Sequence, residues 1–308
     1  MKPARDHARA LERALTEQRN PASERLDEMS TLDIVDLMND QDRQVPTAVR
    51  AAREQIAQAV ELVVEAFRTG GRLFYVGAGT SGRLGVLDAA ECPPTFGTDP
   101  DQVQGIIAGG YGALVRAVEG AEDHPHEAVA ELQRRGFRPP DVLVGIAACG
   151  LTPFVRGALD HARSLGARTV FLTCNPRPEG LPQADVVIAV ETGPEVLTGS
   201  TRLKAGTATK LILNTITTAA MVRLGKCYGN LMVDLRATSA KLRIRSVRIL
   251  RELCSLEQEE AEKLLAEAGG GLKVAILMAK RHISRRDAQA LLEKHRGVLR
   301  SALADPAP

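Results

Sequence analysis

Short, continuous runs of apolar residues recur along the middle of the chain, and segments with helical patterns separate them. The runs cover residues 72–76, 103–108, 141–147, 168–173 and 185–190. Apolar runs without alternation are typical of strands that helices cover on both faces. Because strands and helices alternate, the pattern predicts an α/β fold with a doubly wound, five-stranded parallel sheet.

Apolar residues at helical spacing mark the segments between these strands. One such pattern covers residues 45–69 and stops at Gly70-Gly71. Further helices are expected at 82–90, 111–117, 126–136, 153–165 and 202–224. The helix after the first strand is expected to end at Glu91, just before the pair Pro93-Pro94.

The two ends of the chain differ from this middle part. Residues 1–45 are polar apart from a helical pattern at 31–38, and we interpret them as an N-terminal arm that packs on another surface, such as a second subunit. Beyond residue 240 three helical patterns follow, at 255–268, 272–281 and 284–295. The predicted organisation is therefore an arm at 1–45, an α/β domain at 46–235 and a small three-helix domain at 240–308.

The composition argues against several functional classes. The net charge is only +2 and the arginines are scattered, so we expect no nucleic-acid surface. The five cysteines show no paired spacing, which indicates a reducing cytoplasm rather than disulfides or a zinc site. The N-terminus lacks the apolar core of a signal peptide, and no apolar run is long enough to span a membrane. We expect no metal and no cofactor.

The loop after the first strand is the strongest chemical signal. It reads Gly77-Ala78-Gly79-Thr80-Ser81-Gly82 and opens a helix, the context of a dinucleotide-binding loop. That interpretation requires an acid at the end of the second strand, where the chain instead reads Ala108-Gly109-Gly110. The interpretation that remains is a phosphate-binding loop, in which the helix N-terminus and the hydroxyls of Thr80 and Ser81 hold the phosphate. The simpler alternative is that one of these hydroxyls only caps the helix.

Two further loops resemble this one. The segment from Thr198 to Thr207 follows the fifth strand and offers Ser200 and Thr201 before a long helix. Cys149-Gly150-Leu151-Thr152 follows the third strand, and Thr152 is placed to cap a helix that begins at Pro153. Loops at the carboxyl ends of parallel strands line the crevice where open α/β sheets bind ligands.

Two carboxylates accompany these loops. Glu91 follows an otherwise apolar helix, so we expect it to be partly buried with a raised pKa. Glu122 lies in the acidic segment Glu119-Gly120-Ala121-Glu122-Asp123. A pair of nearby carboxylates can supply one acid and one base, although an acidic segment is more often a solvated face.

Several long motifs make the chain similar to the N-acetylmuramic acid 6-phosphate etherases. They are Gly77–Gly97, which ends Glu-Cys-Pro-Pro-Thr-Phe-Gly, then 119–123, 199–207 and Asn230-Leu231-Met232-Val233-Asp234, and the opening Thr16-Glu17-Gln18-Arg19-Asn20-Pro21. The resemblance covers nearly the whole chain. It implies a sugar isomerase (SIS) domain, a UBA-like helical domain at the C-terminus, and a cytoplasmic homodimer that acts in cell-wall amino-sugar recycling.

The resemblance also implies a reaction and its residues. The substrate would be N-acetylmuramic acid 6-phosphate, and a carbon–oxygen lyase would cleave its D-lactyl ether by elimination and water addition. Glu91 would be the proton donor and Glu122 the second active-site acid, here assigned as the base. The expected phosphate- and substrate-binding residues are Gly79, Thr80, Ser81, Gly82, Thr152, Ser200 and Thr201.

One loop departs from the family pattern. Related sequences usually read Ser-Gly-Arg-Thr where this chain reads Cys149-Gly150-Leu151-Thr152. If the arginine contacts substrate, affinity is reduced here, and if it only braces the loop, little changes. Two other functions also stay open, a non-catalytic phosphosugar sensor similar to the glucokinase regulatory protein and an aldose–ketose isomerase on the same fold.

Overall fold

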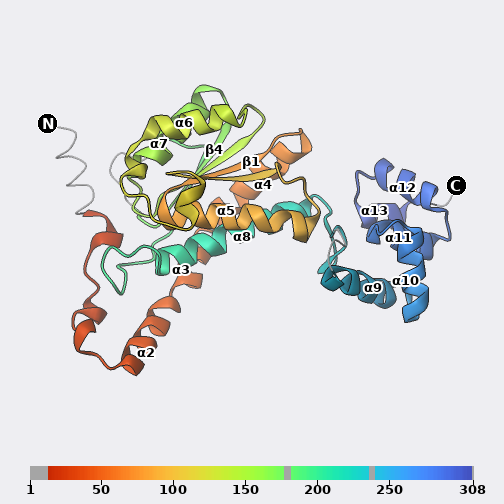
Figure 1. Ribbon diagram of the computed structural model, residues 1–308, viewed down its shortest axis with the longest axis horizontal. Coiled ribbons are helices and arrows are strands. Elements are labelled where there is room, and N and C mark those ends of the chain that lie inside the picture. Colours follow the sequence, from red (N-terminus) through yellow and green to blue (C-terminus); the bar gives the residue numbers. More distant parts are fainter. Residues whose placement is uncertain (1–12, 177–181, 236–239, 307–308) are drawn as a thin grey trace. The chain divides into compact units, whose positions relative to one another are not determined.

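A parallel sheet organises the first part of the chain (Figure 1). Its strands are β1 (Leu73–Gly77), β2 (Val103–Ile107), β3 (Val142–Ile146), β4 (Arg168–Thr173) and β5 (Val186–Ala189). They form one five-stranded sheet in the order β2-β1-β3-β4-β5, and every neighbouring pair is parallel. The predicted fold class is confirmed, and all five strands lie where the apolar runs place them.

This computed structural model describes residues 13–176, 182–235 and 240–306, so the first twelve residues of the N-terminal arm lie outside the described ranges. The chain divides into two compact units. The first unit is Met1–Ala90 with Asp101–Thr217, and the second is Glu91–Pro100 with Thr218–Pro308. Two long helices, α5 (Gly79–Phe96) and α8 (Lys204–Arg223), begin in the first unit and end in the second.

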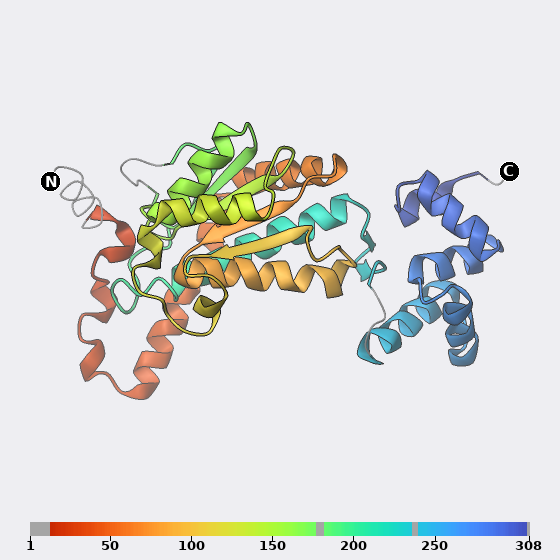
Figure 2. The same cartoon turned by 45° about the horizontal axis from the view of Figure 1, so that its top comes forward.

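Helices cover both faces of the sheet, as a doubly wound fold requires. Figures 1 and 2 show α6 (Pro125–Arg134) and α7 (Pro153–Ser164) on one face, and α4 (Arg53–Arg68), α5 and α8 on the other. Side chains of a strand point alternately to its two faces. Phe74 and Val76 therefore join the core under α6 and α7, whereas Tyr75 points to α5 and donates a hydrogen bond to Asp88 (2.9 Å).

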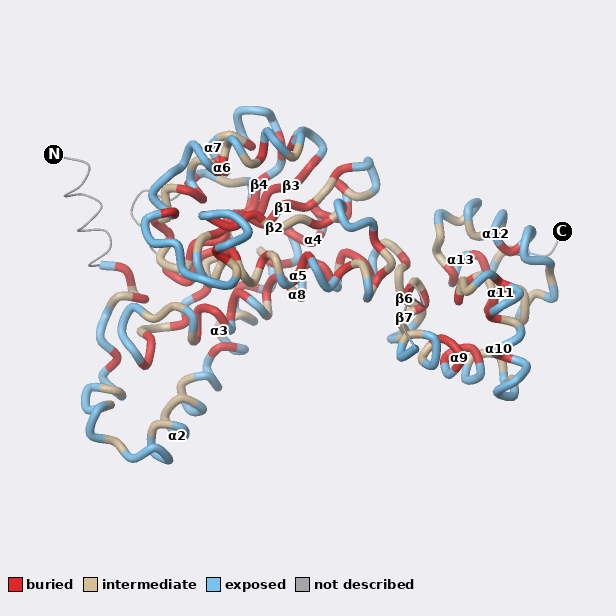
Figure 3. Tube along the Cα trace, in the orientation of Figure 1, coloured by how far each residue is buried: buried red, intermediate tan, exposed pale blue. Residues whose placement is uncertain are grey.

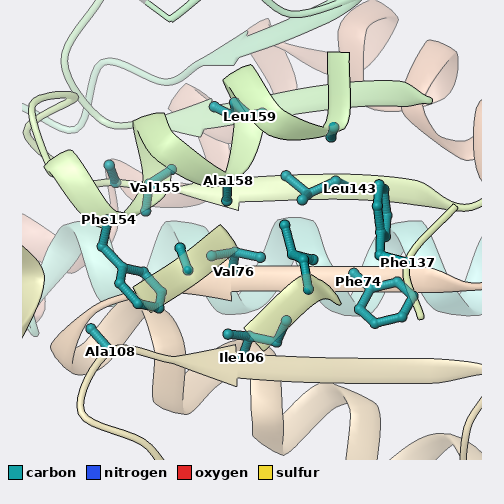
Figure 4. Close-up of a cluster of buried hydrophobic side chains, with 14 of the residues drawn as sticks. Phe74, Val76, Ile106, Ala108, Phe137, Leu143, Phe154, Val155, Ala158 and Leu159 are labelled. Atoms are coloured by element: carbon teal, nitrogen blue, oxygen red, sulfur yellow. The ribbon is translucent and has the colours of Figure 1, made fainter. Parts of the chain in front are cut away.

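The core beneath α6 and α7 is continuous and apolar. Phe154, Val155, Ala158 and Leu159 of α7 lie over the strands in Figure 4. The rings of Phe74 and Phe137 meet edge to face, with centroids 5.2 Å apart, a favourable aromatic geometry. Figure 3 shows that buried residues concentrate along the strands and the inner helix faces. This packing makes the sheet a rigid support for the loops at its edge.

Several helices differ from the sequence-based expectation. The pattern at 45–69 is two helices, α3 (Val45–Ala51) and α4, and residues 111–117 form only the 3-10 turn η4 (Tyr111–Leu114). α5 begins three residues earlier than expected and runs past Glu91, with Pro93 and Pro94 inside it. A proline removes one helical hydrogen bond without forbidding continuation, and the Gly97 N–H still donates to the Pro93 carbonyl (2.9 Å).

The described part of the arm carries three short 3-10 turns, η1 (Leu15–Glu17), η2 (Pro21–Ser23) and η3 (Leu26–Glu28), followed by the helix α2 (Thr31–Asp42). The Ser30 side chain caps α2 by accepting a hydrogen bond from the Asp33 N–H (3.2 Å). None of the twelve α2 residues is buried, and Leu32 and Val35 are exposed. The helical pattern at 31–38 is thus confirmed.

The second unit is helical with one short hairpin. Its described elements are β6 (Cys227–Tyr228), β7 (Leu231–Met232), α9 (Ala240–Cys254), α10 (Gln258–Glu267), α11 (Leu272–Arg281), α12 (Arg285–Lys294) and α13 (Leu299–Ala304). The three expected helices are α10, α11 and α12, and Ser284 caps α12 as predicted. α9 and α13 were not expected. Leu250 of α9 and Leu299 of α13 are buried in the same apolar core as α10, α11 and α12. Among the described residues no helix combines the length and apolarity needed to cross a membrane.

Candidate functional site

The order of the strands in the sheet reverses direction at β1. β2 lies on one side of β1 and β3 on the other, and the helices that follow β1 and β3 cover opposite faces of the sheet (Figure 2). The loops after these two strands therefore diverge at a topological switch point, where open α/β sheets bind ligands. We use the name loop cluster for residues 77–82, 120–123, 148–152 and 199–206, which all belong to the first unit.

Glycines let the first loop turn tightly against the sheet. A Cβ atom added at Gly82 would lie 2.6 Å from the Gly77 carbonyl oxygen and 2.7 Å from Cγ1 of Ile107, and Gly79 has a φ of +53°. α5 begins at Gly79, so Thr80 and Ser81 lie inside its first turn rather than at a capping position. The first N–H groups of an α-helix have no acceptor within the helix. Together with these hydroxyls, they form a suitable phosphate seat.

Glu122 shares a cavity with Gly79, the residue at which α5 begins. Gly79, Arg83 and Glu122 are among the residues that line a hollow of about 150 Å³ at the carboxyl ends of β1 and β2. Glu122 lies in the 3-10 turn η5 (Ala121–Asp123) and is exposed. Nε of Arg83 donates to the Leu114 carbonyl (3.2 Å), which fixes the guanidinium at the rim. The structure thus brings Gly79 and Glu122 together, and adds Arg83, which the sequence analysis did not single out.

The first turn of α8 adjoins the first loop. An added Cβ at Gly206 would lie 3.5 Å from Cγ2 of Thr80 and 3.5 Å from the Thr201 carbonyl oxygen. Ser200 and Thr201 precede α8, whose first residue is Lys204. Thr80 therefore lies beside the first turn of α8, which directly follows the loop that carries Ser200 and Thr201.

The N-terminus of α8 is already occupied by a carboxylate. The two oxygens of Glu195 accept hydrogen bonds from the N–H groups of Lys204 (3.0 Å) and Ala205 (2.9 Å). Glu195 is fully buried, and burial raises the pKa of this carboxyl although the two N–H donors lower it. A ligand at Ser200 and Thr201 would therefore meet side-chain hydroxyls rather than these helix N–H groups.

Glu195 and Lys204 form a buried polar link that the sequence analysis missed. Lys204 is 1% exposed, its Nζ donates to Oε1 of Gln41 (3.0 Å), and burial lowers the pKa of its ammonium group. The only signal in the sequence is a single lysine between a hydroxyl-rich loop and a largely apolar helix. No local pattern indicates that Gln41, more than 150 residues earlier, is its partner.

The third loop is compact and buried. Gly150 adopts a φ of +86°, and the Cys149 carbonyl accepts a hydrogen bond from Nδ2 of Asn175 (3.2 Å). Leu151 is 8% exposed, so its side chain contributes apolar packing to the loop. Thr152 is the residue before α7, but its side chain makes no capping hydrogen bond. The capping role expected for Thr152 is therefore wrong, and its hydroxyl is not used by the helix N-terminus.

Glu91 differs most from its expectation. Glu91 is exposed, so the predicted partial burial is wrong. The reason is that position 91 does not lie on the buried face of α5. It also belongs to the second unit. Asp88, one turn earlier, is the buried acid of this helix at 4% exposure. Within the described ranges, no group of His, Cys, Asp and Glu side chains has the arrangement of a metal site.

Several curated proteins are similar to this chain over nearly its whole length. An N-acetylmuramic acid 6-phosphate etherase of Actinobacillus pleuropneumoniae is 52% identical over 96% of this chain and 97% of its own. One from Synechocystis sp. is 53% identical over 96% of both chains. A third, from Synechococcus sp., is 55% identical over 94% of this chain and 92% of its own.

Two other comparisons concern parts of the chain. The profile of the glucokinase regulatory protein N-terminal SIS domain matches residues 55–163, which include β1, α5, β2 and β3. Among solved structures, a phosphoheptose isomerase from Francisella tularensis matches 63% of this chain and all of its own, with 18% identity and a TM-score of 0.48.

Proposed function

Because this chain belongs to the N-acetylmuramic acid 6-phosphate etherase family, we propose that it converts N-acetylmuramic acid 6-phosphate to N-acetylglucosamine 6-phosphate and D-lactate. The observation that carries the proposal is identity above 50% to these relatives over nearly the full length of both chains. We place the reaction in the breakdown of cell-wall amino sugars. None of the five cysteines forms a disulfide, which supports a reducing, cytoplasmic setting.

In this proposal the loop cluster holds the phosphate. Thr80, Ser81 and the N–H groups at the start of α5 form one part of the seat, together with Gly79 and Gly82. Ser200 and Thr201 complete it from the adjoining loop, and Thr152 offers a hydroxyl from the third. Binding at the phosphate positions the rest of the sugar for reaction without taking part in the chemistry. Neither a metal nor a cofactor is needed for these steps.

The chemistry then requires one base and one acid. In the open-chain sugar, C2 lies beside the C1 aldehyde, so a carboxylate can remove its proton and form an enolate. Lactate leaves from C3 when its ether oxygen is protonated, and water adds to the resulting double bond. We assign the base to Glu122, because it lines the same cavity as Gly79. We assign the acid to Glu91.

The length of α5 supports a particular assignment of the subunit that supplies Glu91. At a rise of about 1.5 Å per residue, Glu91 lies about 18 Å along the helix from Gly79, which is longer than the substrate reaches from its phosphate to C3. We therefore propose a homodimer in which Glu91 of one subunit acts on the substrate held by the loop cluster of the other. Its exposure supports a role between subunits.

The decisive experiment is an assay of the purified protein with N-acetylmuramic acid 6-phosphate. We expect D-lactate and N-acetylglucosamine 6-phosphate in equal amounts. An isomerase would give a ketose and no lactate, and a sensor would bind the compound unchanged. Glu122→Gln should lower kcat about a hundredfold or more, the usual range for the loss of a general base.

Glu91→Gln separates the two acid–base steps. In D₂O this variant should incorporate deuterium at C2 while releasing lactate about a hundredfold more slowly than the wild type. Lactate release at the wild-type rate would show that Glu91 is not the acid. Loss of both deuterium incorporation and lactate release would assign Glu91 to the first step instead.

A further inference from the structure

The N-terminal arm brings a carboxylate of its own to the loop cluster. Oε2 of Glu17 lies 3.1 Å from the position that a Cβ at Gly199 would occupy. Gly199 has a φ of +77° and directly precedes Ser200. The carboxylate therefore lies against the backbone of the loop that carries Ser200 and Thr201, and Glu17 is half-buried there.

Buried polar contacts hold this part of the arm in place. Nδ2 of Asn20 donates to the Pro194 carbonyl (3.1 Å) and to Oε1 of Gln41 (2.9 Å), and the same Gln41 oxygen accepts from Nζ of Lys204. Thr16, next to Glu17, is completely buried. Because the residues on both sides are anchored, the position of Glu17 is set by the fold rather than by a free chain end.

Glu17 of the arm and Glu122 of η5 both act electrostatically on the loop after β3. Burial raises the pKa of the Cys149 thiol, the backbone of Leu151 lowers it, and the negative charges of Glu17 and Glu122 raise it further. Both carboxylates therefore lie near the loop after β3, Glu17 from the arm and Glu122 from η5.

We propose that Glu17 is a substrate-binding residue, whose carboxylate accepts hydrogen bonds from hydroxyl or amide N–H groups of the bound amino sugar. An ionised carboxylate only accepts hydrogen bonds. An ionised phosphate group has no donor for it and repels it, because both groups are negatively charged. The sugar ring substituents are therefore its partners, beside the phosphate seat. This inference rests on the proposed phosphosugar function.

Binding measurements with two ligands test the inference. Isothermal titration calorimetry gives Kd values for N-acetylglucosamine 6-phosphate and for inorganic phosphate, which lacks the sugar donors. Glu17→Gln should weaken binding of the sugar phosphate about tenfold, as expected for the loss of a hydrogen bond to a charged group. Inorganic phosphate should bind equally well or slightly more tightly, since a negative charge has been removed.

Two variants complete the design. Glu17→Asp keeps the charge but withdraws the carboxylate by one methylene, and should also weaken the sugar phosphate selectively. Glu24→Gln removes an exposed carboxylate from the same arm and should change neither Kd. Unchanged sugar-phosphate affinity in both Glu17 variants would overturn the proposal. Equal weakening of both ligands would overturn it as well, because it would show that Glu17 only supports the arm.

The outcome for Glu17 is distinct from that for the reaction. If the wild type binds the sugar phosphate but releases no D-lactate from N-acetylmuramic acid 6-phosphate, the etherase proposal fails while selective weakening in the variants still supports Glu17. If the wild type binds no sugar phosphate at all, both proposals fail.

Discussion

Asp88 shows how a single residue joins three elements. Its Oδ2 accepts a hydrogen bond from the Tyr75 hydroxyl of β1 (2.9 Å). Its Oδ1 accepts from Nδ2 of Asn214 (2.6 Å) and from the hydroxyl of Thr217 (3.2 Å), both in α8. Burial raises the pKa of Asp88 above its ordinary value of 3.8, although these hydrogen bonds lower it in part. The carboxyl therefore links α5, β1 and α8. Its ionised form is less favourable in the folded protein than in the unfolded chain.

This pKa shift predicts a pH dependence of stability. Between the unfolded-state value near 3.8 and the higher folded-state pKa, the folded protein holds the proton more tightly than the unfolded chain. The free energy of unfolding should therefore fall as the pH rises through this interval, by at most about 1.4 kcal/mol per pH unit. Urea unfolding at a series of pH values measures this fall in the free energy of unfolding.

Asp88→Asn removes the titrating group while keeping an oxygen that can accept from Asn214 and Thr217. The fall in stability over this pH interval should be smaller in the variant than in the wild type. Asp160→Asn, on the exposed side of α7, is the matched control and should keep the wild-type slope. Identical slopes for Asp88→Asn and the wild type would contradict the assignment.

At the scale of elements, the close approach of α5 to the sheet controls the first loop. Gly82 allows this contact because any side chain there would collide with Gly77 and Ile107. Gly82→Ala should move the start of α5 outward, lower the free energy of unfolding by about 1–3 kcal/mol and weaken phosphate binding. Thermal unfolding and phosphate titration check both effects.

Gly112→Ala is the control for this substitution. An added Cβ at Gly112 would meet nothing within 4 Å, so stability and phosphate affinity should both stay at the wild-type level. If Gly82→Ala behaves in the same way as Gly112→Ala, the contact between α5 and β1 does not position the phosphate seat.

Strands and helices were predicted correctly where residues close together in the chain carry the whole signal. The five strands consist of continuous apolar residues, and their bounds agree closely with the structure. The end of α5 was misjudged because Pro93 and Pro94 suggest a stop, yet the helix continues to Phe96. α9 was missed because four arginines and one lysine interrupt its apolar pattern, and α13 because six residues carry too little periodicity.

At the scale of the whole molecule, the proposed dimer predicts complementation. A mixture of Glu91→Gln and Glu122→Gln subunits forms heterodimers in which one site keeps both intact carboxylates and the other keeps neither. After denaturation and refolding of an equal mixture, random pairing should restore about a quarter of the wild-type D-lactate release. Each variant refolded alone should stay nearly inactive.

Failure to recover activity in a mixture that still forms dimers would show that each subunit uses its own Glu91. Analytical ultracentrifugation of the refolded mixture establishes that dimers are present. A monomeric wild type would contradict the dimer proposal directly.

The sequence by itself determined the strands, the hydroxyl-bearing loops that follow them and the family motifs, because each depends on residues close together in the chain. Only the tertiary structure decided which loops meet. It placed Thr80 beside Gly206, Glu122 in the cavity with Gly79 and Glu17 against Gly199. It also showed that Glu91 is exposed and that Glu195 occupies the start of α8. These contacts join segments far apart in the chain, and the packing of helices on the sheet brings them together, which no local pattern encodes.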